Sequence, residues 1–399
     1  MQYNWKNFLT VSLMACAVAG GLSACDDDDD DDDNNNALSA NVIALQAINQ
    51  NFVNTTVVPT YAKLADASEA LLADVEKLST KDGLTDANIA AAGAKWKEAR
   101  KYWELSEAFL FGAASNYAID PHIDTWPFNE SAFNSLISAH KALTDADQEV
   151  IDESVATSQQ LTGFHAVEYI LFAKGETKKA SDFDGDDLKD VKLYFVEAAA
   201  ADLYLSSIRL LAAWKGEVSA ERQAILEEAE LEPEDNFGEE FVNAGNAGSR
   251  WKTVQIAAAN ILDGCQDIIG EVNEGKIGTA HTGEDVNYIE SPHAYNSITD
   301  FYDNIVSCAH ALYGVGPDVE WNENLTAAAT SVMAWGAVNA TAETKDVADK
   351  LAAALVAIKA MKSPFVLNYT DASAGKAMEA LGDLDDAIDA LKQKIESAE

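Results

Sequence analysis

Proline and strand-like patterns are scarce in this sequence. Only 7 of its 399 residues are proline, and no segment alternates apolar and polar residues over the length of a strand. Alanine is abundant instead, and apolar residues recur at helical spacing through almost the whole chain. The sequence therefore argues against a β-sheet protein and predicts an all-α protein of packed helical bundles.

Basic residues are also scarce. Lys and Arg number 27 against 67 Asp and Glu, which gives a formal net charge of −40. A strongly acidic protein repels the phosphates of nucleic acids and of anionic lipids, so neither is expected as a partner. Cations and basic proteins are compatible with this charge.

Cysteines and long apolar runs are few. Cys16 and Cys25 lie in the N-terminal segment, and Cys265 and Cys308 could pair outside the cytoplasm without forming a disulfide framework. The apolar run from Phe8 to Ala19 is too short to span a membrane, and no other segment approaches about 20 apolar residues. The sequence therefore predicts no transmembrane anchor.

Residues 1–25 are typical of a bacterial secretion signal. Lys6 lies in a short polar head, the apolar run follows it, and the tetrapeptide Leu-Ser-Ala-Cys ends at Cys25. This tetrapeptide resembles the lipobox of bacterial lipoproteins, in which the chain is cut before the cysteine and that cysteine is lipidated. We expect a lipid on Cys25 to anchor the protein to a membrane. The alternative is a soluble secreted protein with an incidental cysteine.

Residues 26–39 form a second distinctive segment. It opens with eight consecutive aspartates, residues 26–33, and such a block of like charge stays unfolded, so it predicts a disordered tether. Its place directly after Cys25 resembles the acidic signal that sends lipoproteins to the outer face of the outer membrane in Bacteroidetes-type bacteria. We expect an outer-membrane lipoprotein exposed at the cell surface. The alternative is that the aspartates are only a solvated spacer.

The chain after the tether is long enough for two domains. The acidic stretch around Pro233 is the best candidate boundary. We therefore predict an N-terminal helical bundle over residues 40–232 and a C-terminal helical bundle over residues 233–399, each with about four main helices.

Local signals predict several helix boundaries. Pro59 should end a first helix and separate it from a second. Residues 86–111 are predicted to form one long helix, and residues 188–214 another. Residues 270–290 are rich in glycine and are predicted to be a loop.

A first motif lies in the strongly apolar helical segment 163–172, which reads Gly-Phe-His-Ala-Val-Glu-Tyr-Ile-Leu-Phe. Its two ionisable residues, His165 and Glu168, are three apart and therefore share one face of the helix. A helix that is apolar on nearly all sides is buried, and buried ionisable groups need partners or a metal ion. The alternative is a core histidine satisfied by its neighbouring glutamate.

A second motif lies in the predicted helix 86–111. Arg100, Trp103, Glu104 and Glu107 share a face at helical spacing. A Glu-x-x-Glu pair is usually solvated surface, but the surrounding Trp, Phe and Leu residues favour partial burial. We expect Arg100 to hold one of the two glutamates by a charge-assisted hydrogen bond.

A proline-stiffened loop follows this helix and carries Asp120, Asp124 and Trp126. Either aspartate could return a carboxylate to the face of Glu104 and Glu107. The sequence does not decide which of the two does so.

A third motif occupies residues 289–301. Ser291 is a good N-cap, and Pro292 suits the first position of the helix that is predicted to follow. The polar residues of interest in this motif are Glu290, Ser291, Asn296, Ser297 and Asp300.

Together the three motifs resemble those of the imelysin-like family, which also contains iron-regulated surface proteins of bacteria. The resemblance runs over most of residues 40–315. It implies two packed all-α bundles with a polar functional cleft where they meet, and clefts between domains commonly bind small ligands.

The first hypothesis for function is that the protein captures a metal ion or an iron compound at the cell surface, as part of iron acquisition. The candidate ligands are His165, Glu168, Glu104, Glu107 and Asp120 or Asp124. Carboxylates with one imidazole suit iron, manganese, zinc or copper and discriminate poorly among them. We expect Fe, Zn or Cu as the ion, and an outer-membrane uptake protein as a further partner.

The second hypothesis is a metallopeptidase, because the family takes its name from an insulin-cleaving enzyme. The zinc peptidase signature needs two histidines four apart with a glutamate between them. The helix of the first motif has one histidine, so the sequence favours binding over catalysis. A third hypothesis is a structural docking module for another surface protein, since helical bundles host many functions.

Overall fold

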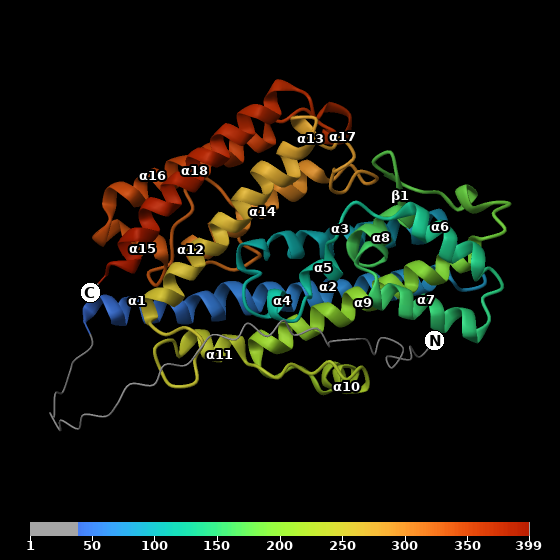
Figure 1. Ribbon diagram of the computed structural model, residues 1–399, viewed down its shortest axis with the longest axis horizontal. Helices are drawn as coiled ribbons and strands as arrows, with labels where there is room; N and C mark the ends of the chain where they lie inside the picture. Colours follow the sequence, from blue (N-terminus) through green and yellow to red (C-terminus); the bar gives the residue numbers. More distant parts are fainter. Residues whose placement is uncertain (1–38, 399) are drawn as a thin grey trace.

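The computed structural model describes residues 39–398 and is all-α, as the sequence predicts (Figure 1). Two short strands, β1 (Phe172–Ala173) and β2 (Glu176–Thr177), pair antiparallel in a small hairpin that was not predicted. Within the described part of the chain, no helix is both long and apolar enough to cross a membrane. The signal segment, Cys25 and nearly all of the predicted tether lie outside the described residues.

A continuous helical rod begins the described chain, and the predicted break at Pro59 is wrong. α1 (Ala40–Asn51) runs through a π-helical segment (Phe52–Val57) directly into α2 (Val58–Leu78). Proline has no N–H to contribute to the helical ladder. The wider π turns just before Pro59 shift the hydrogen-bond register, and the N–H that follows the segment bonds five residues back. The helix therefore continues past the proline.

Helices of the N-terminal half pack around α2. α2 lies against α3 (Asp86–Glu104) and α9 (Lys189–Lys215), and α9 also contacts α7 (Asp145–Thr157) and α8 (Gly163–Leu171). α9 confirms the helix predicted for this stretch, and its residues are buried on most sides because other helices cover it. The shorter helices of this half are α4 (Ala113–Asn116), α5 (Asp120–Ile123), α6 (Glu130–Ala139), α10 (Ala220–Glu228) and α11 (Phe237–Val242), with 3-10 turns η3 (Glu107–Phe109), η4 (Gln159–Leu161) and η5 (Ala180–Phe183).

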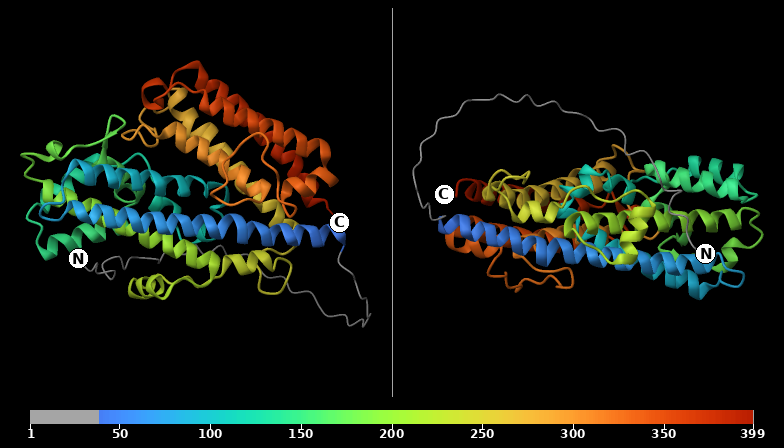
Figure 2. Two further views of the ribbon diagram at one scale, coloured as in Figure 1. Left: turned by 180° about the vertical axis from the view of Figure 1, so that it is seen from behind. Right: turned by 90° about the horizontal axis from the view of Figure 1, so that it is seen from below.

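Helices of the C-terminal half form a second set. α12 (Val254–Gly270) and α16 (Thr341–Lys359) both pack against α14 (Ser297–Tyr313) and α18 (Ala372–Glu396). Figure 2 shows these yellow to red helices on one side of the blue rod. The remaining elements of this half are the π-helix η6 (Glu271–Gly278) and the helices α13 (Thr279–His281), α15 (Val332–Asn339) and α17 (Phe365–Asn368).

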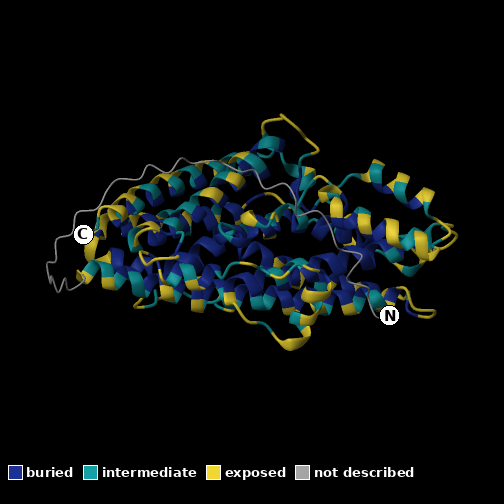
Figure 3. Ribbon diagram, turned by 60° about the horizontal axis from the view of Figure 1, so that its bottom comes forward, coloured by how far each residue is buried: buried dark blue, intermediate teal, exposed yellow. Residues whose placement is uncertain are grey.

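The two sets touch along α12 and α14. α12 packs against α1 and η3, and α14 packs against α3 and η3. Buried residues face inward along these contacts, while exposed ones line the outer surface (Figure 3). The second motif, at the end of α3 and the start of η3, therefore packs against α14, which carries the last residues of the third motif.

Three further boundary predictions are wrong. α3 ends at Glu104, earlier than predicted, and Glu107 lies beyond a turn in η3. The predicted glycine-rich loop is helical over residues 271–281, first as the π-helix η6 and then as α13. α14 begins only at Ser297, because Ser291 has a left-handed φ of 48°, outside the extended conformation of an N-cap. These are local hydrogen-bond registers that hydrophobic periodicity does not specify.

The two remaining cysteines lie on neighbouring helices. Cys265 on α12 and Cys308 on α14 are buried free thiols, and Cys308 Sγ lies 3.7 Å from the Cys265 carbonyl oxygen. The disulfide that the sequence left open is not formed in this structure.

Two glycines of α12 allow a test of how tightly the sets are packed. A Cβ on Gly264 would lie 2.2 Å from the carbonyl oxygen of Ala108 in η3, whereas a Cβ on Gly270 would meet nothing within 4 Å. We expect Gly264→Ala to lower the free energy of unfolding by about 1–3 kcal/mol through overpacking. Gly270→Ala should raise the free energy of unfolding by about 0.5–1 kcal/mol. Gly270 already has helical dihedrals, so alanine fits there without strain, and an alanine loses less conformational entropy on folding than a glycine does.

Urea denaturation of both variants measures the two changes under the same conditions. Equal effects of the two substitutions would contradict the close approach of α12 to η3.

Candidate functional site

Gly163 determines how closely α8 approaches α5. Its φ is 69°, and a Cβ there would lie 2.1 Å from the carbonyl oxygen of Ile123 at the end of α5. Only glycine accepts both this conformation and this approach. The contact places His165, on the first turn of α8, beside Asp124, which directly follows α5.

His165 is buried and bonded at both ring nitrogens. Its Nε2 lies 3.0 Å from Asp124 Oδ1, and its Nδ1 lies 3.1 Å from Glu168 Oε2. Burial lowers the pKa of His165, but the hydrogen bonds to Asp124 and Glu168 outweigh it and raise the pKa to about 9. The imidazole is therefore protonated at neutral pH in this arrangement.

Glu168 contacts the backbone of the third motif with one oxygen and His165 with the other. Its Oε1 accepts hydrogen bonds of 2.8 Å from the backbone N–H groups of His293 and Ala294, and its Oε2 faces His165. Glu168 thus orients the imidazole and ties α8 to the third motif. The sequence places Glu168 among the candidate ligands, and in this structure both of its carboxylate oxygens contact other groups of the protein.

Arg100 lies fully buried among four carboxylates. Its Nη1 bonds to Asp124, and its Nη2 lies 2.5 Å from Glu104 Oε1. The same Nη2 lies 2.8 Å from Glu290 Oε1, and Nε lies 3.7 Å from Asp300 Oδ1. The predicted contact of Arg100 with a glutamate of its own face is confirmed at Glu104. The planar fork allows one side chain to bridge acids from both halves of the chain.

Lys276 is a second buried cation, and sequence reasoning missed it. Its Nζ lies 2.9 Å from Glu290 Oε1, 3.8 Å from Glu104 Oε2 and 4.0 Å from Glu107 Oε1. It projects from η6, in the segment predicted to be a glycine-rich loop, and lysine is rarely buried unless paired. The apolar residues Val272 and Ile277 beside it were the available signal of a buried segment.

Glu104 and Glu107 face the same space although α3 ends between them. The Ser106 hydroxyl donates to the Trp103 carbonyl oxygen at 2.7 Å, which replaces a helical bond and turns the chain. The Asn304 amide of α14 donates to Glu104. Burial raises the pKa of both glutamates well above the usual range, and it outweighs the lowering by Arg100 and Lys276 at Glu104 and by Lys276 at Glu107.

Asp124, not Asp120, lies at the centre of the site. Besides Arg100 and His165, it accepts a 2.8 Å hydrogen bond from Trp103 Nε1. Burial raises the pKa of Asp124, but Arg100 and His165 outweigh it and hold the pKa below the usual range. Asp120 is half-buried outside these contacts, and burial and the charge of Asp124 raise its pKa to about 7.

The third motif encloses the site from the C-terminal half. The Ser297 hydroxyl donates to the Glu290 carbonyl oxygen at 2.6 Å and fixes the residue that pairs with Arg100. The Asn296 amide donates to Asp300 Oδ1 at 2.6 Å. Burial raises the pKa of Asp300 to about 7, against the lowering by Arg100. Ser291 is also buried there.

Trp126 covers the cluster on one side. Its ring centre lies 6.1 Å from that of His165 and 5.3 Å from that of Tyr288, and Lys276 Nζ lies 5.2 Å from the ring centre of Trp126. Glu271, 3.7 Å from Lys276, has 44% of its side chain exposed. Trp126 and Glu271 therefore lie at the edge of the site, between its buried groups and the surface.

We call this set of residues the buried acidic cluster. Three cationic side chains face six buried carboxyl groups, and the raised pKa values of Glu104, Glu107 and Asp300 mean that protons on these acids offset part of the excess. The members of the cluster are Arg100, His165 and Lys276 with Glu104, Glu107, Asp124, Glu168, Glu290 and Asp300. Glu290 Oε2 is buried without a hydrogen-bond partner among the described residues.

Two groups within the cluster have the spacing of metal ligands. One ligand atom each from Asp124, His165 and Glu290 lies within 4.8 Å of the others, and the same holds for Glu104, Glu107 and Asp124. Carboxylate oxygens with one imidazole nitrogen fit iron, manganese, zinc and copper. The residues present therefore fit a bound cation, and Asp124 belongs to both groups.

Comparisons with known proteins agree with this architecture. A family model described as Imelysin matches residues 57–396. Iron-regulated protein A of Synechococcus elongatus is 29% identical over 258 residues, and the match covers 64% of this chain but only 60% of that protein.

Two solved structures share the fold. The first is described as an iron-regulated protein A precursor from Parabacteroides distasonis; it has a TM-score of 0.76 and 24% identity, over 90% of this chain and 97% of that one. The second, an imelysin-like protein from Psychrobacter arcticum, has a TM-score of 0.58 and 15% identity, over 90% and 95% of the two chains.

Proposed function

This chain belongs to the imelysin family, and from that premise we propose that it binds a metal ion or an iron compound in the buried acidic cluster. The observation that carries the proposal is the surplus of carboxyl groups over cations in a space shielded from water. Unpaired buried carboxylates are costly, so a cation that enters the cluster gains more there than it would at a solvated surface. The name of the cyanobacterial relative, an iron-regulated protein, supports iron as the metal.

The two ligand groups assign roles to single residues. In the first group, Asp124 and Glu290 supply oxygen and His165 supplies Nε2, while Glu168 holds the opposite ring nitrogen. In the second group the ligands are all carboxylates. Arg100 and Lys276 hold the acids of both halves together when no ion is present. When bound, the ion would take over part of this neutralisation.

Binding to the native state alone should stabilise the protein. With free Fe²⁺, Zn²⁺ or Cu²⁺ at about a hundredfold above its dissociation constant, the free energy of unfolding should rise by about 2.7 kcal/mol. Asp124→Asn should abolish this rise, because Asp124 is common to both groups. His165→Gln should abolish it only if the ion occupies the first group. Differential scanning fluorimetry of the full chain, with and without each metal, measures the effect.

The matched control is Asp303→Asn. Asp303 is another buried aspartate on α14, with its pKa raised to about 7 by burial, but it belongs to neither ligand group. This variant should retain the full metal response. If none of the three ions shifts the wild-type melting temperature, the metal-binding proposal fails.

The geometry of the described residues does not specifically favour the metallopeptidase alternative. His165 is engaged by a carboxylate at each ring nitrogen, and the cluster offers no second histidine within the described residues. The same set of proteins tests it. Cleavage of an unfolded peptide by the wild type, lost in Asp124→Asn and kept in Asp303→Asn, would establish the peptidase instead.

Display at the cell surface is a separate part of the proposal. Its support is the lipobox ending at Cys25 and the aspartate run behind it, both in the sequence. A lipid on Cys25 would hold the folded body at the outer membrane, where it would meet metal before an uptake protein does.

A further inference from the structure

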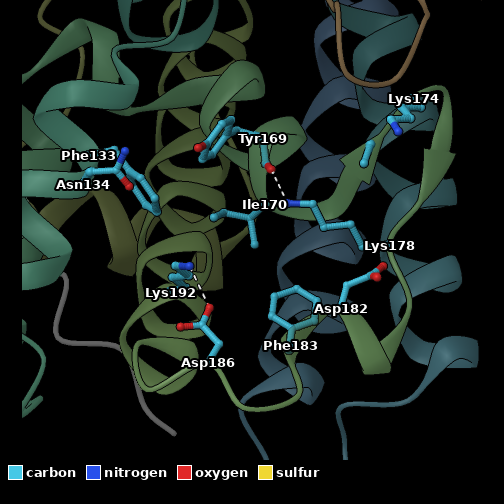
Figure 4. A pocket seen from close by; sticks show the side chains of 11 residues that line it. Phe133, Asn134, Tyr169, Ile170, Lys174, Lys178, Asp182, Phe183, Asp186 and Lys192 are labelled. Carbon is cyan, nitrogen blue, oxygen red and sulfur yellow. Dashed lines mark hydrogen bonds and ion pairs between the residues drawn. The ribbon is translucent and has the colours of Figure 1, made fainter.

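A second site candidate lies beside α8, away from the buried acidic cluster. A cavity of about 330 Å³ opens between α6, α8, the β1–β2 hairpin and the segment that leads into α9. Figure 4 shows the side chains that converge on it. Cavities of this size are large enough for a small organic ligand.

Three of the eleven residues that line this cavity are aromatic. Phe133 of α6, Tyr169 of α8 and Phe183 of η5 line it, with Ile170 between them. Phe133 and Tyr169 are packed edge to face, with ring centres 5.3 Å apart. Flat apolar walls of this kind favour an aromatic ring, because stacked and edge-on contacts add to the burial of its surface.

The polar lining of the cavity consists of three lysines, two aspartates and Asn134. Lys174, Lys178 and Lys192 line it together with Asp182 and Asp186. Both aspartates already have partners. Lys192 Nζ lies 2.7 Å from Asp186, and Asp182 accepts a 2.7 Å hydrogen bond from the backbone N–H of Lys179. A local excess of lysine is unusual in a chain with a net charge of −40.

Lys178 is the cation best placed to meet a ligand. Its Nζ donates one hydrogen bond of 2.7 Å, to the Tyr169 carbonyl oxygen (Figure 4). An ammonium group has three donors, so two more are available. Burial, and secondarily the charge of Lys192, lower the pKa of Lys178 to about 8, which means that its charge is incompletely compensated. An anion beside Nζ would compensate the charge of Lys178.

We propose that this cavity, the lysine pocket, binds a small aromatic carboxylate, with the ring among Phe133, Tyr169 and Phe183 and the carboxylate on Lys178. The aromatic walls recognise the ring, and the lysines recognise the charge. An aliphatic acid would lose the ring contacts, and a neutral aromatic amide would lose the ion pair. The proposal is independent of metal binding in the buried acidic cluster.

Three probes that differ in one feature each test the proposal. Benzoate should bind the full chain in isothermal titration calorimetry, and benzamide and acetate should each bind at least about tenfold more weakly. If benzamide binds as well as benzoate, or if benzoate does not bind, the proposal is overturned.

Variants locate the binding. Lys178→Gln should weaken benzoate binding by about tenfold or more. Lys174→Gln, at an exposed position that does not threaten folding, should weaken it by a smaller factor. Lys189→Gln is the matched control, since Lys189 lies on the same helix as Lys192 but outside the pocket, paired with Asp190. An equal loss in Lys189→Gln, or no loss in both Lys178→Gln and Lys174→Gln, would show that benzoate binds elsewhere.

Discussion

Arg100→Met should lower the free energy of unfolding by about 3–5 kcal/mol. Arg100 is fully buried and contacts Glu104, Asp124, Glu290 and Asp300. Methionine replaces the apolar stem of arginine but carries no charge, so the acids would be left with only Lys276 and His165 as cationic partners. Removing one side of a buried ion network costs several kcal/mol because the remaining charges are uncompensated. Urea denaturation at neutral pH measures the loss.

Arg222 provides the matched control at the surface. It also contacts two carboxylates with Nη2, Asp66 at 2.7 Å and Glu69 at 2.8 Å, but these acids are 66% and 49% exposed. Arg222→Met should therefore cost less than about 1 kcal/mol, as exposed pairs do. If the two arginine substitutions have similar effects, the buried acidic cluster does not depend on Arg100.

Arg100→Lys separates charge from geometry. Lysine keeps the positive charge but lacks the planar fork, whose separate nitrogens contact different acids at once, so the cost of Arg100→Lys should be smaller than that of Arg100→Met but not zero. The result shows how far the cluster needs the guanidinium fork that joins α3 to the third motif.

The sequence predicted the helical architecture well, because hydrophobic periodicity is a local signal repeated along the chain. α9 is an example, with observed ends within one residue of the prediction. The π-helices were not predicted, since they replace one hydrogen-bond register by another without changing which residues are apolar. The continuous rod across Pro59 and the helical segment η6 were missed for this reason.

The motifs predicted which residues form most of the candidate site, but not which contacts these residues make. His165, Arg100, Asp124 and Glu290, which come from different motifs, lie together in the structure. What the sequence could not give is which acid faces which cation, because such contacts join residues far apart in the chain. Lys276 was missed for the same reason: most of its partners are far from it in the chain, on α3 and on η3, and the third is Glu290.

The affinity of the buried acidic cluster for a metal ion should continue to rise as the pH increases above 7. Judged by the ordinary pKa of imidazole, about 6.5, proton competition at His165 would end near pH 7. The contacts with Asp124 and Glu168 raise the pKa of His165 to about 9, so a metal at Nε2 must displace a proton at any pH below that value. The sign is therefore fixed: lower pH weakens binding, and affinity should rise about tenfold per pH unit between about pH 7 and pH 8.

Proton release distinguishes His165 from the carboxyl groups that also titrate. Burial raises the pKa of Glu104, Glu107 and Asp300, so these acids add to the protons that a metal displaces. Calorimetric titration with Zn²⁺ in buffers of different ionisation enthalpy counts the released protons. In His165→Gln the count should fall by about one if the ion occupies the group with Asp124 and Glu290. An unchanged count would place the ion among the carboxylates alone, and a wild-type affinity that is flat between about pH 7 and pH 8 would show that no buried proton has to leave.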